Sequence, residues 1–175
     1  GGHAAGEVAS QTAVTEVRKC AAALAASFDV PASLKVLFER AHRRIIGNMR
    51  RHPGQRDGMG TTLTACVIDG DTLYVGHAGD SALYLVRGGA CERLTEKQSH
   101  YHRLSNCLGS RADAFKGAQV VSRRLARGDV VVLATDGLAD YLENDKRPTP
   151  DLLARVAAPV PFDDFAAARV RFALA

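Results

Sequence analysis

The spacing of apolar residues changes its period near residue 58, and this change constrains the fold more than any other feature of the chain. In residues 6–28 and 31–45, apolar side chains recur every three or four positions, as on one face of an amphipathic helix. Pro31 suits the first turn of the second helix. After the turn-rich segment 52–58, short runs of alternating residues are typical of β-strands. Two helices followed by a series of strands predict an α+β protein.

Glycine-containing turns divide the second part of the chain into short predicted strands. Residues 61–68, 73–77, 82–86 and 91–94 are expected to form an antiparallel meander, with a hairpin turn at Asp69-Gly70. Residues 119–123 and 130–134 are predicted to pair with each other through the turn at 127–129. We expect a helical turn at 138–142, a short helix at 151–157 and a closing strand or helix at 165–174.

Composition excludes several classes of protein. The apolar fraction of 46% and charged fraction of 24% are ordinary for a globular domain, and the longest apolar runs are too short to cross a membrane. The N-terminus does not resemble a signal peptide. The four cysteines are far apart and show no zinc spacing, which favours a reduced, cytoplasmic protein. Basic clusters at 43–52 and 123–127 are read as solvated faces, because no aromatic residues interleave with them to stack on nucleic acid bases.

Carboxylates at predicted strand ends are the most informative polar residues. Asp136 follows the apolar run 130–134, Asp80 lies in a Gly-Asp turn, and the pair Asp163-Asp164 precedes the last segment. Each one alone is best explained as a turn residue. Together they suit a hard cation such as Mg²⁺ or Mn²⁺, which prefers oxygen ligands. The sequence has no H-E-x-x-H, G-x-S-x-G or Walker motif that would favour other chemistry.

Seven segments, in the right order along nearly the whole chain, resemble motifs of the bacterial type 2C family of metal-dependent protein phosphatases. The segment 1–7 (GGHAAGE) resembles the tail of D-G-x-G-G-H-x-x-G-E, and 59–63 (MGTTL) resembles the M-G-T-T strand. Residues 78–81 (AGDS) are similar to the G-D-S-R turn, 94–95 to L-T, and 105–109 to a segment ending in L-G. Residues 128–129 and 134–140 (ATDGLAD) resemble G-D and S-D-G-L-x-D, and 163–164 resembles the D-N or D-D pair.

The resemblance implies a fold and a reaction. It implies two antiparallel β-sheets packed as a sandwich flanked by helices, and hydrolysis of phosphoserine or phosphothreonine in a protein substrate by a water bridging two Mn²⁺ or Mg²⁺ ions. By motif, Asp136 would be a shared metal ligand, Asp163 a ligand of the second ion, and Asp80 a ligand of a third, weaker ion. Gly60, Thr61 and Thr62 would support the site from the sheet beneath it. We expect residues 1–175 to form one domain and a monomer, with no nucleic acid or membrane partner.

Departures from the family pattern leave two explanations open. The motif's first aspartate would precede Gly1, as would the opening strands and a phosphate-binding arginine. Ala82 replaces the arginine of G-D-S-R, and Lys97-Gln98 replaces the Asp-His of D-H-S. A short stretch after Asp140 leaves the choice between Asp163 and Asp164 open. The chain is either part of an active phosphatase or a phosphatase-like module that binds phosphorylated partners without turnover; nucleic acid binding through residues 43–51 is the weakest alternative.

Overall fold

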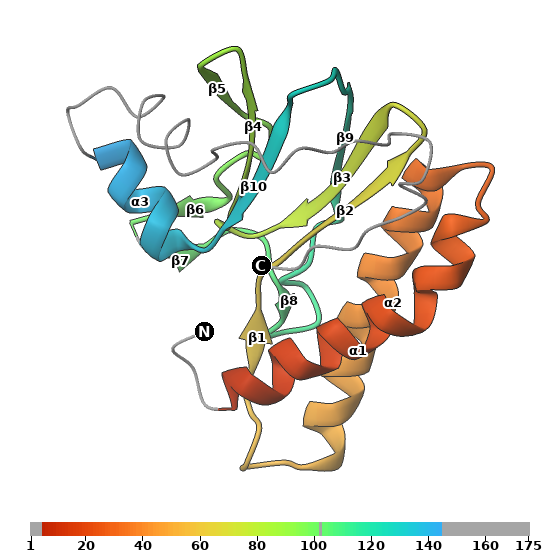
Figure 1. The fold of residues 1–175 in the computed structure, drawn as a ribbon. Helices are drawn as coiled ribbons and strands as arrows, with labels where there is room; N and C mark the ends of the chain where they lie inside the picture. Colours follow the sequence, from red (N-terminus) through yellow and green to blue (C-terminus); the bar gives the residue numbers. More distant parts are fainter. Residues whose placement is uncertain (1–4, 102, 145–175) are drawn as a thin grey trace.

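The computed structural model describes residues 5–101 and 103–144, which form four layers (Figure 1). Helices α1 (Gly6–Ala25) and α2 (Val30–Arg51) form the first layer. The second is a sheet in the order β2 (Leu63–Asp69), β3 (Thr72–Ala78), β9 (Gln119–Arg124). The third is a sheet in the order β10 (Val130–Ala134), β4 (Ala82–Arg87), β5 (Ala90–Arg93), and α3 (Asp136–Asn144) packs outside it. All strand pairs are antiparallel.

Two short strand pairs complete the described part of the chain. Strand β1 (Gly60–Thr61) pairs with β8 (Leu108–Gly109), and β6 (Ser99–His100) pairs with β7 (Arg103–Leu104). The first pair lies beside the helices, where β8 contacts α2 and β1 contacts α1. The second pair lies at the end of the sandwich near α3 (Figure 1).

The alternation of side chains along the strands produces three apolar layers. In β2, Leu63, Ala65 and Val67 pack against the helices, whereas Cys66 points into the space between the sheets. Tyr84 and Val86 of β4 lie on the opposite side, against α3 and β10. Both faces of β2 and β4 are therefore buried, which is what a sandwich covered by helices requires. The predicted α+β sandwich flanked by helices is confirmed.

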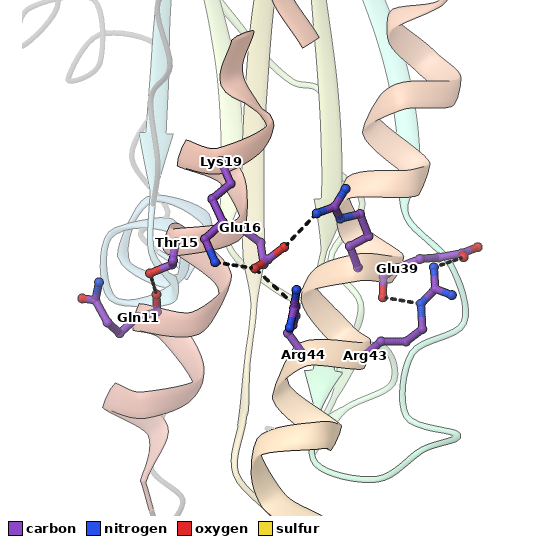
Figure 2. A network of polar contacts seen from close by, with 8 residues as sticks. Gln11, Thr15, Glu16, Lys19, Glu39, Arg43 and Arg44 are labelled. Carbon is purple, nitrogen blue, oxygen red and sulfur yellow. Dashed lines mark hydrogen bonds and ion pairs between the residues drawn. The ribbon is translucent and has the colours of Figure 1, made fainter. Parts of the chain in front are cut away.

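Helices α1 and α2 are joined by a charged contact as well as by apolar packing. The Glu16 carboxylate in α1 is almost fully buried, with 3% of its side chain exposed, and three cations surround it (Figure 2). They are Lys19 at 3.3 Å, Arg40 at 3.5 Å and Arg44 at 3.6 Å, the last two from α2. Asp29 caps the start of α2, where its side chain accepts a hydrogen bond from the Ala32 N–H, and Pro31 lies in the first turn as predicted.

Two of the predicted strand pairings are wrong. Strands β3 and β4 are consecutive in the chain but belong to different sheets, so the expected meander is broken at the turn 79–81. Likewise β9 pairs with β3 and β10 pairs with β4, so these two strands are not partners. The turn 79–81 between β3 and β4 and the segment 125–129 between β9 and β10 each cross from one sheet to the other. For β3 and β4 the apolar pattern could not show this, because residues on both faces of these two strands are buried.

Several element boundaries also differ from the predictions. The strand expected at 61–68 is interrupted at Thr62, where β1 ends before β2 begins. The helical turn expected at 138–142 is a nine-residue helix that starts at Asp136. The elements predicted at 151–157 and 165–174, together with Asp163, Asp164 and His102, lie outside the described residues. Within residues 5–101 and 103–144, no helix has the length and apolar character needed to cross a membrane.

Candidate metal-binding cleft

Three carboxylates line one cleft at the end of the sandwich. Asp80 lies in the turn between β3 and β4, Asp136 is the first residue of α3, and Asp140 lies one helical turn further along. The cleft has a volume of about 420 Å³. Its other lining residues are Lys97, Ser99, His100 and Tyr101. With three carboxylates and one lysine among its lining residues the cleft is acidic, and the loop that carries β6 forms part of its wall.

The register of two strands explains why Asp80 and Asp136 share this cleft. Ala82 of β4 pairs with Ala134 of β10 in an antiparallel ladder. Asp80 lies two residues before the first of these, and Asp136 lies two residues after the second. Because the strands run in opposite directions, both aspartates emerge at the same end of the sheet. Asp140 follows Asp136 by four residues in α3, so both lie on one face of that helix.

The turn that carries Asp80 has little room to vary. Gly79 has a φ of 125°, and a Cβ atom built there would lie 2.4 Å from Cγ2 of Thr62. Only glycine adopts such a backbone easily and fits so close to a neighbour. The Thr62 and Ser81 hydroxyls are 3.1 Å apart, and Arg93 donates a hydrogen bond of 3.2 Å to the carbonyl of Asp80. Thr62 thus contacts the turn from the break between β1 and β2.

His77 ties the same turn to the loop after β5. Its Nε2 lies 3.0 Å from the carbonyl oxygens of both Gly79 and Glu96, so this nitrogen carries the hydrogen and donates. Its Nδ1 then accepts from the Thr64 hydroxyl at 2.9 Å. The pKa of His77 is lowered to about 4, chiefly by burial and to a smaller extent by the positive charge of Arg93, against hydrogen bonds to the two carbonyls that raise it. His77 is neutral near pH 7 and has a structural role.

The carboxylates influence each other electrostatically. Burial raises the pKa of Asp80 above its usual value, and the negative charges of Asp136 and Asp140 raise it further. Lys97 acts in the opposite direction on the pKa of Asp80. The Lys97 ammonium also donates a hydrogen bond of 2.5 Å to Oδ1 of Asp140. A cation close to Asp80 and Asp136 would remove the repulsion between them.

The donor chemistry of the cleft fits a hard divalent cation, although the described residues do not complete a site. Asp80 and Asp136 offer carboxylate oxygens, the ligands that Mg²⁺ and Mn²⁺ prefer. Within residues 5–101 and 103–144, no three histidine, cysteine or carboxylate side chains are arranged to hold an ion. The third predicted ligand, Asp163, lies outside this range. Asp80 and Asp136 thus provide part of a ligand set.

The sequence alone had not assigned Asp140, Lys97 or Tyr101 to the site. The position of Asp140, four residues after Asp136 in the same apolar-flanked segment, was a usable signal. In the sequence, Lys97 is only a departure from a motif, and Tyr101, which is fully exposed, lies in no distinguishing pattern. His100 is exposed and also lines the cleft.

Comparison with known proteins assigns the family. The model of the family described as Protein phosphatase 2C matches residues 1–171. The chain is a member of the protein phosphatase 2C family. Phosphatases of this family are metal-dependent hydrolases of phosphoproteins. The match covers both sheets and all three described helices, so the fold and the family assignment agree.

Among its relatives, the chain is 31% identical over 168 residues to the serine/threonine protein phosphatase PstP of Mycobacterium tuberculosis, covering 83% of this chain and 31% of PstP. It is 28% identical over 196 residues to the protein phosphatase PhpP of Streptococcus pneumoniae, covering 99% of this chain and 76% of PhpP. The crystal structure of the PstP catalytic domain in complex with two manganese ions superposes with a TM-score of 0.69 at 26% identity, covering 87% of this chain and 74% of that chain. The chain thus spans about a third of the length of PstP.

Proposed function

We propose that this protein phosphatase 2C chain is the metal-binding part of a serine/threonine protein phosphatase that hydrolyses phosphoserine or phosphothreonine in protein substrates. The observation that carries the proposal is the convergence of Asp80, Asp136 and Asp140 on one cleft, from segments up to 60 positions apart in sequence. These aspartates stand in the segments that resemble the family's G-D-S-R and S-D-G-L-x-D motifs. A relative with 26% identity is known in complex with two manganese ions.

The proposed cofactors are two Mn²⁺ or Mg²⁺ ions. Asp136 would be a ligand of the central ions, and Asp163, outside the described residues, would be a ligand of one of them. When bound, such ions lower the pKa of a coordinated water and neutralise phosphoryl oxygens. The chain's own contribution is to hold Asp136 at the start of a helix, where its Oδ1 accepts a 2.8 Å hydrogen bond from the Gly137 N–H.

The rigid turn below the cleft would keep Asp80 in place while substrate binds. His77, Thr62 and Arg93 hold this turn from three different segments. Preorganised carboxylates avoid a cost of reorganisation when the cations bind. The exposed side chains of His100 and Tyr101 at the wall of the cleft are placed to contact the polypeptide around a phosphorylated residue.

The second candidate function is a module that binds phosphorylated partners without turnover. The observation that favours it is Lys97, a basic residue inside the acidic cleft. A lysine there would assist binding of a phosphate group, whereas it competes with metal ions for the carboxylates. The two functions differ in their need for Asp136: the enzyme requires it for turnover, whereas the binding module does not require it to bind a phosphorylated partner.

The test is hydrolysis of para-nitrophenyl phosphate and of a phosphothreonine peptide with Mn²⁺, with and without EDTA. The family motif places one aspartate before Gly1, so the assay compares this chain with a form extended upstream. We expect turnover that EDTA abolishes and that Asp136→Asn reduces at least a hundredfold, because that variant keeps the shape but loses the charge. Asp113→Asn is the control, since Asp113 is exposed, pairs with the exposed Arg111 and does not line the cleft. Phosphopeptide binding without turnover in either form, unaffected by Asp136→Asn, would contradict the enzyme and favour the binding module.

A further inference from the structure

Lys97 is held inside the acidic cleft by its own chain neighbours. The residue before it, Glu96, is fixed through its carbonyl to His77 Nε2 at 3.0 Å and through its N–H to Gln119 Oε1 at 2.9 Å. The residue after it, Gln98, donates its backbone N–H to the Gly79 carbonyl at 2.9 Å. Both neighbours are therefore attached to the end of β3 or to β9, its partner strand. The backbone of Lys97 has little freedom to leave the cleft.

The side chain of Lys97 points into the group of carboxylates. Its ammonium donates a hydrogen bond to Asp140 Oδ1 at 2.5 Å, with 39% of the lysine side chain and 35% of the aspartate side chain exposed. It also acts electrostatically on Asp80, across the same cleft. Three carboxylates carry a charge of −3 and attract cations from solution, whereas Lys97 supplies one positive charge from the chain itself.

We propose that the Lys97 ammonium is a tethered cation that occupies the Asp80–Asp140 side of the cleft and takes the place of a divalent ion there. Asp136, at the start of α3, is then left as the carboxylate that faces the metal ions. The inference rests on the proposed metal-binding function of this cleft. The inference adds that the cleft binds one divalent ion fewer than its carboxylates would allow. The reason is that the Lys97 ammonium already neutralises negative charge on the Asp80–Asp140 side.

A lysine in this position also changes how the charge of the cleft depends on the Mn²⁺ concentration. A tethered ammonium is present at any Mn²⁺ concentration, whereas a weak ion site fills only when the metal is abundant. The positive charge on the Asp140 side should therefore be independent of the metal supply. Removing that charge while keeping the length of the side chain should convert this side of the cleft into a divalent-ion site.

The experiment is calorimetric titration of Mn²⁺ into the 175-residue chain, comparing wild type, Lys97→Met and Lys97→Gln. We expect both variants to bind one more Mn²⁺ per chain than wild type, or to bind Mn²⁺ roughly tenfold tighter, since a like charge within contact range shifts such equilibria by one or more powers of ten. Lys35→Met is the matched control: Lys35 is exposed on α2 and does not line the cleft. It should behave as wild type does.

A double variant locates the new site. In Lys97→Met/Asp80→Asn the gain in Mn²⁺ binding should disappear, because the carboxylate that receives the ion has been neutralised. If folded Lys97→Met and Lys97→Gln bind Mn²⁺ with the number and affinity of wild type, or if the double variant keeps the gain, the inference is wrong while the proposed function stands. If neither wild type nor the variants bind Mn²⁺ at all, both the inference and the proposed metal-dependent function are wrong.

Discussion

Gln98 and Gly79 hold each other by two hydrogen bonds of 2.9 Å, one in each direction. The Gly79 N–H donates to the side-chain oxygen Oε1 of Gln98, and the Gln98 backbone N–H donates to the Gly79 carbonyl. The same Oε1 accepts a third hydrogen bond, from Asn106 Nδ2 at 2.9 Å. Gln98 departs from the histidine of the family's D-H-S motif, and the structure shows what it does instead. It fixes the turn that carries Asp80.

Replacing Gln98 should therefore weaken the fold around the cleft. In Gln98→Ala, the buried Gly79 N–H loses its acceptor and Asn106 Nδ2 loses one of two, since it also donates to the Gly117 carbonyl. A buried donor left without a partner costs about 1–3 kcal/mol. We expect the free energy of unfolding, measured by urea titration with circular dichroism, to fall by about 2 kcal/mol. Gln55→Ala, in the exposed loop after α2, is the control and should change it by less than about 0.5 kcal/mol. Equal losses in the two variants would show that water replaces the Gln98 oxygen without cost.

Gly79 should not tolerate any side chain. A Cβ atom at this position would lie 2.4 Å from Cγ2 and 2.5 Å from Cβ of Thr62, and the φ of 125° is strained for an L-residue. We expect Gly79→Ala to lower the free energy of unfolding by about 3 kcal/mol or more, from backbone strain and overpacking together. Gly88→Ala is the control, since Gly88 has a φ of 55° but no atom within 4 Å of the added methyl group. That variant should lose only about 1 kcal/mol, the cost of the left-handed conformation.

The positions of the strands could be predicted from the sequence, but their partners could not. The period of 2 places β3 and β4 to within one residue at each end. The turn between them is as short as a hairpin turn, yet the chain crosses from one sheet to the other. Both strands are buried on both faces, and a meander would bury their apolar residues as well as a sandwich does. Only the resemblance to a known family indicated two sheets.

The candidate site was also predictable only in part: its residues could be identified from the sequence, but their proximity could not. Asp80 and Asp136 were identified by their places after strands and within motifs, and both line the cleft. Their proximity depends on the pairing of Ala82 with Ala134, a register that no local pattern specifies. The position of Lys97 depends on contacts of Glu96 and Gln98 with residues about 20 positions away in sequence. Such contacts come from the folded chain, so they could not be read from spacing.

His77 makes stability sensitive to acid. Its pKa is about 4 in the folded protein, below the ordinary value of 6.5, so the unfolded chain binds the proton more tightly. The contribution of neutral His77 to the free energy of unfolding is fully present above pH 6.5 and is lost as the pH falls towards 4. The shift corresponds to about 3 kcal/mol between these limits. Burial also lowers the pKa of His42, which adds a loss of the same sign.

The contribution of His77 can be isolated by comparing pH profiles. The measurement is the free energy of unfolding from urea titrations at intervals from pH 7 to pH 4.5. Carboxylates and His42 titrate in wild type and in His77→Gln alike, so the difference in slope reports His77 alone. We expect a flatter profile for His77→Gln. His100→Gln, at an exposed position, is the control. Parallel profiles for wild type and His77→Gln would mean that His77 is not held neutral by burial.

Glu16 should stabilise the contact between α1 and α2 far more than an exposed ion pair does. Its side chain is 3% exposed and lies near Lys19, Arg40 and Arg44, whose positive charges would repel one another without it (Figure 2). We expect Glu16→Ala to lower the free energy of unfolding by about 1–3 kcal/mol, since removing a buried partner leaves a cavity and uncompensated charge. Glu39→Ala is the control. Glu39 pairs with Arg43 at 3.5 Å across one turn of α2, with 61% of its side chain exposed, so its loss should cost less than about 0.5 kcal/mol. Measured in 0.5 M NaCl, where exposed pairs are screened, the difference between the two variants should persist. A Glu16→Ala loss as small as that of Glu39→Ala would show that apolar packing alone holds the helices together.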